Sequence, residues 1–370
     1  MKAVILVGGE GTRLRPLTCN TPKPMVPIVN RPFLEHMIDY LRKYDIDDII
    51  LSMCYLPDRI QSYFGDGSSF GVKLTYVVEN TPLGTAGAVK NVERYLDDTC
   101  FVLNGDVMTD LDLTAMLAFH REHRSKVTIS LAPVEDPTAY GVVETNSEGH
   151  VKRFIEKPSW DAVTTNLINA GTYVLEPDVL KYVPPNLYYM FEHGLFPVLL
   201  QVGDPLYGFA TNDYWIDIGT PEKYITVHHD ILMGKIQKPF PGQCVHDGIW
   251  IGRGAQVDPT VKMTGPVVIG EESVIGPGVR ITGPLVMGNQ CQIGHDTVIE
   301  DAVLWHNVRV GHHVTMKRCV VASNCLLEDS TWLTNGAIIG DDVTIRTGNR
   351  LEHGIRIWAN RILEPNTITF

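Results

Sequence analysis

The chain has few of the residues that build disulfide frameworks or structural zinc sites. Its 370 residues include only seven cysteines, which are scattered and form no CxxC pair. Small secreted scaffolds and zinc ribbons need cysteines at close, regular spacing. The sequence therefore argues against both classes. Cys319 and Cys325 fall inside a repeat, where we expect them to fill a core.

Long hydrophobic runs and an excess of positive charge are also missing. No apolar run is long enough to cross a bilayer, and the apolar N-terminus reaches Gly8 before it attains the length of a signal peptide. The formal net charge is -12, which argues against a broad nucleic-acid-binding face. We therefore expect a cytoplasmic protein that binds neither membranes nor nucleic acid.

A glycine-rich segment stands near the N-terminus, where the chain reads VILVGGEGTRLRPLTCNTPKPMVP. An apolar strand ends here in Gly8, Gly9 and Gly11, which leave backbone N–H groups accessible to a phosphate chain. Two cations, Arg13 and Lys23, follow, and neighbouring prolines stiffen the backbone around Lys23. Neither GxxxxGK[ST] nor GxGxxG is present. The segment predicts a polyphosphate site that belongs neither to a P-loop kinase nor to a dinucleotide dehydrogenase.

Short apolar runs alternate with helical patterns through the first part of the chain. The patterns predict strands over residues 3–7, 48–53, 73–78, 100–103, 127–131, 142–145 and 168–175, and helices over 32–43, 57–64, 84–95, 191–201 and 221–233. The first helix would begin at Pro32 behind a cap at Asn30. Such alternation predicts an α/β fold, with a Rossmann-like, mostly parallel sheet, helices on both faces and a site at the carboxyl ends of the strands.

A different pattern begins at Ile251, from which an apolar residue falls at every sixth place up to Trp305. Several of these residues are followed directly by glycine, which suits a tight corner. The pattern predicts a left-handed parallel β-helix of hexapeptide repeats, whose coils bury their apolar corners by stacking. The period resumes in a new phase at Val321, which predicts a loop or irregular coil around residues 311–316.

The two patterns divide the chain into domains. We predict a catalytic domain over residues 1–236, a linker over 237–248 and the β-helix over 249–370. The linker is marked by prolines and a glycine, which interrupt regular structure. Flat faces and an open end make the β-helix a candidate surface for homo-oligomer assembly.

Two aspartates are candidate metal ligands. Asp106 follows the apolar strand that ends in Asn-Gly, and Asp217 stands among apolar residues in WIDIGTP. Asn-Gly-Asp is also favourable turn chemistry, which is the alternative for Asp106. An aspartate in an apolar strand is costly unless it is paired or binds a metal, and Mg²⁺ prefers carboxylate oxygens. We predict that Asp106 and Asp217 bind Mg²⁺ together.

These motifs together resemble a known family. GG-x-GTRLRPLT followed by PKPMVPI is similar, nearly residue for residue, to the signature of the sugar-phosphate nucleotidyltransferases, and NGD, INAGTY and WIDIGTP extend the resemblance. The resemblance implies that a sugar 1-phosphate attacks the α-phosphorus of an NTP, giving a nucleotide sugar and pyrophosphate. It also implies Arg13, Lys23 and Asp106 as the catalytic residues, with Arg13 on the expelled pyrophosphate and Lys23 on the α-phosphate.

The resemblance further implies two binding sites. The nucleotide site would contain Leu6, Gly8, Gly9, Gly11, Thr12, Arg13, Lys23, Glu79, Gly84 and Thr85. The sugar-phosphate site would contain Gly141, Glu156, Lys157, Asn169 and Thr172, with Lys157 on the attacking phosphate. From the residues alone, a solvated ion pair is the ordinary interpretation of Glu156 and Lys157, and the small residues of PLGTAG could serve close packing at a helix start.

The order of the motifs is most similar to guanylyltransferases that act on mannose 1-phosphate, which implies GTP and mannose 1-phosphate as substrates. Guanine presents adjacent N–H donors, from which the Glu79 carboxylate could accept hydrogen bonds. The alternative is that Glu79 is a solvated residue at the end of a strand. Uridylyl-, thymidylyl- and adenylyltransferases of glucose 1-phosphate share most of these strings and remain an alternative. The tail departs from related guanylyltransferases, because Ala359 stands where a proline is often found.

Two further interpretations concern the chain as a whole. In a bifunctional enzyme the β-helix would transfer acyl groups, and its histidines at 295, 306, 312 and 313 would offer a base. In a regulatory subunit that binds nucleotide sugars without catalysis, Arg13, Lys23, Asp106 or Asp217 would be lost. All four are present, which favours an enzyme.

Overall fold

The computed structural model describes every residue except Pro239, Pro241, Asp247 and Phe370. The chain forms two compact units. The first comprises Met1–Gly9 and Leu34–Asp217, and the second comprises Glu10–Phe33 and Ile218–Phe370. The chain therefore passes from one unit to the other within its N-terminal glycine-rich segment. Three of the undescribed residues fall within the predicted linker over residues 237–248, and the predicted domain boundaries stay a prediction.

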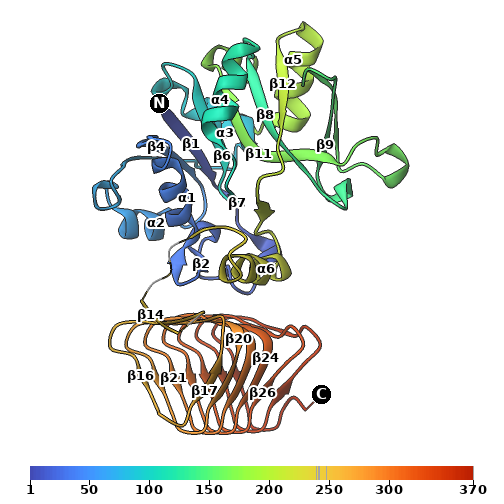
Figure 1. Ribbon diagram of the computed structural model, residues 1–370. Helices are drawn as coiled ribbons and strands as arrows, with labels where there is room; N and C mark the ends of the chain where they lie inside the picture. The colour runs from blue at the N-terminus through green and yellow to red at the C-terminus, as the bar shows by residue number, and fades with distance from the viewer. Residues whose placement is uncertain (239, 241, 247, 370) are drawn as a thin grey trace. The chain divides into compact units, whose positions relative to one another are not determined.

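The first unit is built on a nine-stranded mixed sheet (Figure 1). Its strands are β1 (Lys2–Val7), β4 (Asp48–Met53), β5 (Lys73–Val78), β6 (Cys100–Asn104), β8 (Val127–Pro133), β9 (Gly141–Thr145), β10 (Val151–Glu156), β11 (Leu167–Leu175) and β12 (Leu206–Ala210). The main strand order is β10-β9-β11-β6-β1-β4-β5, and β8 pairs with β11 and β12. The strands β6, β1, β4 and β5 are parallel, whereas β11 runs antiparallel to β6. A separate two-stranded sheet joins β7 (Val107–Thr109) to β13 (Trp215–Asp217).

Five α-helices lie in this part of the chain, and they are α1 (Phe33–Arg42), α2 (Pro57–Phe64), α3 (Gly84–Asn91), α4 (Leu113–Glu122) and α5 (Phe196–Val202). All but α4 match predicted helices. The helix predicted over 84–95 ends in the short 3₁₀ helix Glu93–Tyr95, and the helix predicted over 191–201 begins as the π-helix Phe191–Leu195. The sequence did carry a signal for α4, because the Asp112 side chain accepts the N–H groups of Thr114 and Ala115 as an N-cap.

The central parallel strands β1, β4 and β6 are buried on both faces. Val4 of β1 packs in one cluster with Ala86 and Val89 of α3. Its neighbour Ile5 points to the opposite face and is also fully buried. Strands that are apolar on both faces are typical of α/β sheets covered by helices on two sides. The predicted Rossmann-like arrangement is confirmed, and the polar site residues are left to the loops at the strand ends.

The second unit contains a parallel β-helix (Figure 1). Its strands are β14 (Gln243–His246), β15 (Ile249–Ile251), β16 (Gln256–Val257), β17 (Lys262–Thr264), β18 (Val267–Ile269), β19 (Val274–Ile275), β20 (Arg280–Met287), β21 (Gln292–Ile293), β22 (Val298–Leu304), β23 (Arg309–Val310), β24 (Thr315–Val321), β25 (Leu326–Leu327), β26 (Trp332–Leu333), β27 (Ile338–Ile339), β28 (Thr344–Ile345), β29 (Arg350–Leu351), β30 (Arg356–Ile357) and β31 (Ile362–Leu363). Three hexapeptides make one coil, so Ile251 pairs with Ile269, which pairs with Met287. The apolar residues of the six-residue period line one continuous core, as predicted.

The irregular coil predicted around residues 311–316 is wrong. Those residues form an ordinary corner followed by the start of β24. The phase of the six-residue apolar period changes instead at the corners within β22 and β24. Gly283 and Pro284 of β20 lie opposite the single residue Asp301 of β22, so this corner is one residue shorter. As a result Leu304, and not Trp305, takes the inward position in the core.

The N-terminal part of the second unit contains a hairpin and the helix α6 (Pro221–Leu232). The hairpin joins β2 (Pro27–Ile28) to β3 (Arg31–Pro32). The predicted cap at Asn30 is wrong, because Asn30 is a hairpin-turn residue with φ 66° and α1 begins only at Phe33. The Asn30 side chain instead donates to the carbonyl of Met287 in the β-helix, at 2.7 Å.

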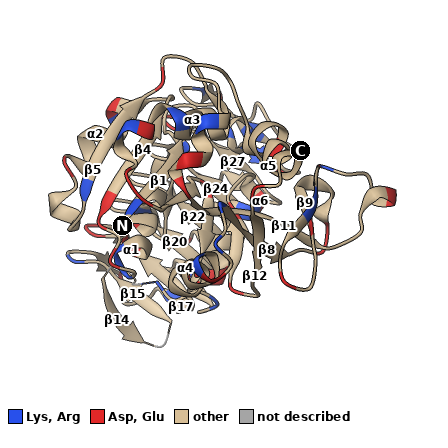
Figure 2. Cartoon of the chain, turned by 90° about the horizontal axis from the view of Figure 1, so that it is seen from above, with Lys and Arg blue, Asp and Glu red and all other residues tan. Residues whose placement is uncertain are grey.

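Acidic and basic residues are interspersed along the described elements (Figure 2). None of the described helices combines the length and the apolar stretch that crossing a bilayer requires.

Candidate active site

The carboxyl ends of β1 and β6 adjoin, as expected for the site of an open α/β sheet. Leu6 lies in register between Ser52 of β4 and Asn104 of β6. The N–H of Gly105 donates to the carbonyl of Leu6 at 2.9 Å. A Cβ on Gly105 would lie 2.5 Å from that carbonyl oxygen. Glycine is therefore required where the strand turns toward Asp106.

The two predicted metal ligands lie at the same end of the sheet formed by β7 and β13. Asp217 pairs with Val107, and Asp106 is the residue immediately before Val107. Opposite Cα atoms in an antiparallel ladder are about 5 Å apart, so the backbone of Asp217 lies close to that of the residue after Asp106, and shared metal binding by the two carboxylates stays a prediction. Asp217 is only 8% exposed, and its Oδ1 accepts a hydrogen bond from the Tyr140 hydroxyl at 3.0 Å.

The chemistry of this strand end fits a hard divalent cation. Both aspartates offer carboxylate oxygens. Asn104 lies two residues before Asp106, and its buried Oδ1 has no hydrogen-bond partner among the described residues. Mg²⁺ prefers a small number of carboxylates and keeps waters or substrate oxygens as its other ligands. The donor set therefore suits Mg²⁺ better than a metal that prefers nitrogen or sulfur.

The predicted sugar-phosphate residues Gly141, Glu156 and Lys157 are brought together by the pairing of β9 and β10. Gly141 pairs with Glu156, and the N–H of Lys157 donates to the carbonyl of Tyr140 at 2.9 Å. A Cβ on Gly141 would lie 2.9 Å from Oε2 of Glu156, so glycine leaves the space that this carboxylate occupies. Tyr140 links the group to Asp217 through its hydroxyl.

Lys157 forms an ion pair with Glu156, with 3.6 Å between Nζ and Oε1. The lysine side chain is 66% exposed. An ion pair this exposed stabilises a protein by only about 0–1 kcal/mol. Lys157 can therefore exchange Glu156 for a phosphate at little cost, and its assignment to the attacking phosphate stays a prediction.

Glu192 is a candidate site residue that the sequence reasoning missed. Its Oε1 accepts the Nδ2–H of Asn169 at 3.2 Å, and its Oε2 accepts the hydroxyl of Thr85 at 3.4 Å. Burial raises the pKa of Glu192, and the negative charge of Glu156 adds to the effect. Glu192 thus connects a residue predicted for the nucleotide with one predicted for the sugar. The signal was an acidic residue within the apolar string MFEHGLF, the same kind of signal that identified Asp217.

Thr172, predicted for the sugar phosphate, lies in β11 beside β6. It pairs with Leu103, and its N–H donates to the hydroxyl of Ser130 at 3.1 Å. The residue is only 2% exposed. Thr172 is therefore far less accessible than the half-buried Asn169 on the same strand.

The glycines of PLGTAG have a packing role. Gly84 has φ 72°, and a Cβ on it would lie 2.8 Å from the carbonyl of Tyr189. The N–H of Gly87 donates to the same carbonyl at 2.9 Å. The two glycines allow the chain before the π-helix to cross closely over α3. The roles of Gly84 and Thr85 in nucleotide binding stay predictions.

Glu79 is not a solvated strand end, because it is 7% exposed. Its Oε1 accepts the hydroxyl of Ser52 at 2.8 Å, and its Oε2 accepts the N–H of Leu83 at 2.9 Å. The carboxylate therefore closes the loop that leads into α3. Each carboxylate oxygen has a second lone pair, so Glu79 keeps the capacity to accept an N–H of a base, and this role stays a prediction.

Gly8 and Gly9 lie at the end of the first segment of the first unit, and the other predicted nucleotide residues lie in the second unit. Thr12 and Arg13 begin the 3₁₀ helix Thr12–Leu14, and Lys23 begins the 3₁₀ helix Lys23–Met25. Gly11 has φ 63°, and a Cβ on it would lie 3.3 Å from the Cβ of Lys23. The loop thus folds Gly11 against the lysine. Lys23 is buried and Arg13 is exposed.

The β-helix supports this loop directly. Arg356 of β30 donates through Nη1 to the carbonyl of Arg15 at 3.2 Å and to that of Arg13 at 3.5 Å. Sequence reasoning missed this contact, because the partners are separated by most of the chain. Arg356 therefore holds the backbone beside a residue predicted to bind pyrophosphate.

Family models match both parts of the chain. The model described as nucleotidyl transferase matches residues 2–234, which is more than half of the chain. The chain belongs to the nucleotidyl transferase family. A second model, described as the EIF2B subunit epsilon LbH domain, matches residues 246–351 and agrees with the predicted left-handed β-helix. The nucleotidyl transferase match spans the strand ends described above, and the expected family is thereby confirmed.

Curated nucleotidyl transferases include several relatives at similar identity. A mannose-1-phosphate guanylyltransferase from Mycobacterium tuberculosis is 40% identical over 72% of this chain and 79% of its own length. A mannose-1-phosphate guanyltransferase from Eremothecium gossypii is 40% identical over 95% of this chain and 96% of its own length. A UTP--glucose-1-phosphate uridylyltransferase from Synechocystis is 36% identical over 72% of this chain and 73% of its own length.

Among solved structures, the chain is similar to HddC from Yersinia pseudotuberculosis, whose crystal structure is described as complexed with GMP-PN. The identity is 33% and the TM-score is 0.55. The match covers 62% of this chain and 99% of HddC.

Proposed function

We propose that this nucleotidyl transferase joins GTP to mannose 1-phosphate, giving GDP-mannose and pyrophosphate. The observation that supports the proposal is the register of β7 and β13, in which Asp217 lies opposite Val107, the residue that follows Asp106. The choice of substrates rests on the two relatives named for mannose 1-phosphate, one of which matches almost the whole chain.

The reaction needs alignment and charge neutralisation rather than an enzyme nucleophile. The sugar phosphate is itself an anion that attacks the α-phosphorus, so the protein must hold two anions in line. In the proposed mechanism Lys157 binds the attacking phosphate, Lys23 binds the α-phosphate and Arg13 binds the departing pyrophosphate. Glu156 accepts hydrogen bonds from the sugar hydroxyls, and Asn169 donates hydrogen bonds to them.

Asp106 and Asp217 are proposed to hold Mg²⁺. When bound, the ion supplies positive charge that offsets the repulsion between the phosphates. The chain's own residues prepare for it, because Tyr140 fixes one oxygen of Asp217 and the turn at Gly105 directs Asp106 to the same strand end. Carboxylates that are already oriented lose less conformational entropy when the cation binds.

Base and sugar preference need a direct test, because a uridylyltransferase is also among the relatives. Pyrophosphate release should be measured with Mg²⁺ across all pairs of GTP, UTP, dTTP or ATP with mannose or glucose 1-phosphate. GTP with mannose 1-phosphate is expected to give the highest kcat/KM. A higher value for another pair would overturn the substrate assignment, and no pyrophosphate from any pair would overturn nucleotidyl transfer.

The setting of the enzyme is also proposed. We infer a cytoplasmic location from the composition and a homo-oligomer in which the β-helix, the catalytic part or both form the contacts between subunits. Light scattering on the purified chain tests the second inference. A mass close to 41.2 kDa, the mass of one chain, would contradict it.

A further inference from the structure

One corner of the β-helix gathers three histidines and an aspartate from two consecutive coils. Because β21 pairs with β23 in register, the corner that follows each strand places His295 beside His312. The two rings are stacked, with centroids 3.8 Å apart. The ring of His313 lies nearly perpendicular to that of His295, with centroids 4.9 Å apart. None of these residues belongs to the candidate active site.

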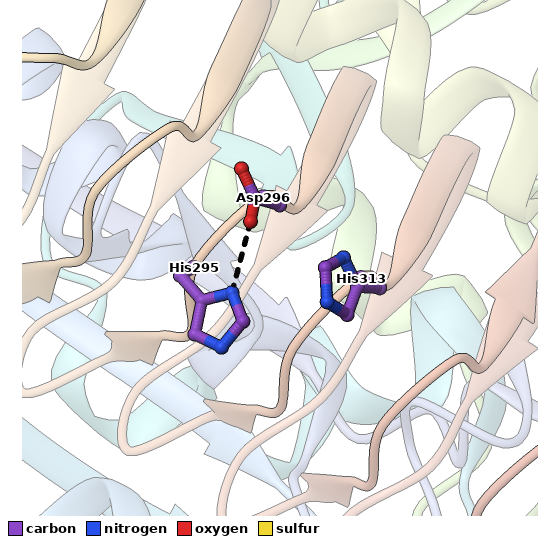
Figure 3. Close-up of side chains that lie close together, drawn as sticks. All are labelled: His295, Asp296 and His313. Carbon is purple, nitrogen blue, oxygen red and sulfur yellow. Dashed lines mark hydrogen bonds and ion pairs between the residues drawn. The ribbon is translucent and has the colours of Figure 1, made fainter.

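His295, Asp296 and His313, here called the metal corner, each offer one ligand atom, and these three atoms lie within 4.8 Å of one another (Figure 3). His295 Nδ1 and Asp296 Oδ2 are 3.0 Å apart. Zinc bonds to nitrogen and oxygen are about 2.0–2.2 Å long, so two ligand atoms on one ion lie roughly 3–4 Å apart. Small side-chain rotations close the set, and His295 and Asp296 are exposed enough to make them, with side chains 40% and 58% exposed.

The backbone already holds the metal corner in place. Asp296 and His313 occupy the same left-handed position in successive coils, with φ 56° and 55°. The N–H of His313 donates to the carbonyl of His295 at 3.1 Å. The N–H of His295 donates to Nδ1 of His312 at 3.1 Å, and the His312 ring stacks on that of His295.

Two glycines keep the space around the metal corner open. A Cβ on Gly278 would lie 2.3 Å from Oδ1 of Asp296. A Cβ on Gly294 would lie 2.7 Å from Nδ1 of His312. A larger residue at Gly278 would displace the carboxylate, and one at Gly294 would clash with the backbone of Gly311 and with the ring of His312.

We propose that the metal corner binds one divalent transition-metal ion such as Zn²⁺, through a nitrogen of His295, an oxygen of Asp296 and a nitrogen of His313, with water as the remaining ligand. Imidazole nitrogens select zinc, copper or nickel over magnesium and calcium, which prefer oxygen. The metal corner therefore differs in chemistry from the carboxylates of the candidate active site. The bound ion would link two coils that hydrogen bonds and ring stacking also join at this corner.

Calorimetric titration of the full-length protein with zinc chloride tests the proposal. An excess of Mg²⁺ is included so that sites made only of oxygen ligands are occupied. The test variant is His313→Asn, because asparagine tolerates the left-handed conformation and an amide is a poor zinc ligand. The matched control is His353→Asn, which replaces an exposed histidine of the same β-helix in the same conformation, φ 57°.

The wild-type protein and the control are expected to bind one Zn²⁺ per chain, and His313→Asn is expected to bind it more than about 100-fold more weakly, because losing a ligand costs more than losing an outer partner. Zinc should also raise the unfolding temperature of the wild type and the control but not that of His313→Asn. Equal binding by both variants, or no binding by the wild type, would overturn the proposal. Unchanged pyrophosphate release by His313→Asn shows that the variant is folded.

Discussion

The indole Nε1 of Trp305 donates a hydrogen bond to the hydroxyl of Tyr224 at 2.9 Å, and this hydroxyl donates to the carbonyl of Pro27 at 2.6 Å. Burial raises the pKa of Tyr224, so the phenol keeps its proton at neutral pH and remains a donor. These two hydrogen bonds, here called the relay, join a coil of the β-helix to the helix α6 and to the N-terminal hairpin. The segment that carries Arg13 and Lys23 is anchored to the β-helix at its hairpin.

Replacing Trp305 with phenylalanine removes the first hydrogen bond of this relay. We expect the free energy of unfolding to fall by about 1–3 kcal/mol, because the buried phenol loses its donor partner. Denaturant unfolding measures the change. Trp358→Phe, at a residue that is half exposed, should change the free energy by less than about 0.5 kcal/mol. Equal effects of the two substitutions would mean that the relay contributes nothing to stability.

Replacing Arg356 with alanine removes the two hydrogen bonds to the carbonyls of Arg13 and Arg15. If Arg13 binds pyrophosphate, the KM for pyrophosphate in the reverse reaction should rise roughly 10-fold, which corresponds to about 1.4 kcal/mol. The KM for the nucleotide sugar should change less. The exposed Arg361 serves as the control for loss of one positive charge. A similar KM for pyrophosphate in Arg356→Ala and Arg361→Ala would refute the positioning role.

Replacing Tyr140 with phenylalanine tests the metal assignment without touching a proposed ligand. Loss of the hydrogen bond to Asp217 should raise the Mg²⁺ concentration needed for half-maximal rate by about 10–100-fold, as is typical of outer-shell partners. Saturating Mg²⁺ should restore most of the rate. Asp217→Asn should instead lose most turnover at every Mg²⁺ concentration. Tyr140→Phe with an unaltered Mg²⁺ dependence would argue against a metal on Asp217.

Acid should destabilise the β-helix through His306. Burial lowers the pKa of this imidazole below its usual value of 6.5, and its Nδ1 accepts the N–H of Asn289 at 3.0 Å. The unfolded chain therefore binds a proton more readily than the folded one, so stability is complete above the unfolded pKa and falls as the pH drops through the folded pKa.

Unfolding temperatures between about pH 7 and pH 5 measure this loss. We expect a shallower acid dependence in His306→Gln than in the wild type. The exposed His353 provides the comparison, since His353→Gln should retain the wild-type slope. If both variants retain that slope, His306 is not the group responsible.

Regular periodicity is what made most of the fold predictable. The strand around Val4 is a short apolar run that is buried on both faces, and its end is marked clearly by the following Gly8. The six-residue period of the β-helix is equally explicit. It failed at Trp305 because a corner shortened by one residue moves the inward position to Leu304, and nothing in the local sequence distinguishes the two apolar neighbours.

The candidate site could be predicted only where each residue carried its own signal. Asp106 and Asp217 could be identified because a carboxylate beside an apolar strand is costly unless it is paired or binds a metal. The pairing of Asp217 with Val107, next to Asp106, could not be predicted from composition or period, because it depends on the register of two strands far apart in the sequence. Glu192 carried the same signal and was missed. Arg356 carried none, because an exposed arginine on a coil is unremarkable until its partner is known.

The passage of the chain between its two units after Gly9 limits how freely the tail can be exchanged. Residues Glu10–Phe33 pack in the same compact unit as the β-helix. A chimera that joins this N-terminal part to the tail of a relative would have to supply an indole in place of Trp305 and a guanidinium in place of Arg356. Without them, the transplanted tail would leave the segment that carries Arg13 and Lys23 without these two contacts.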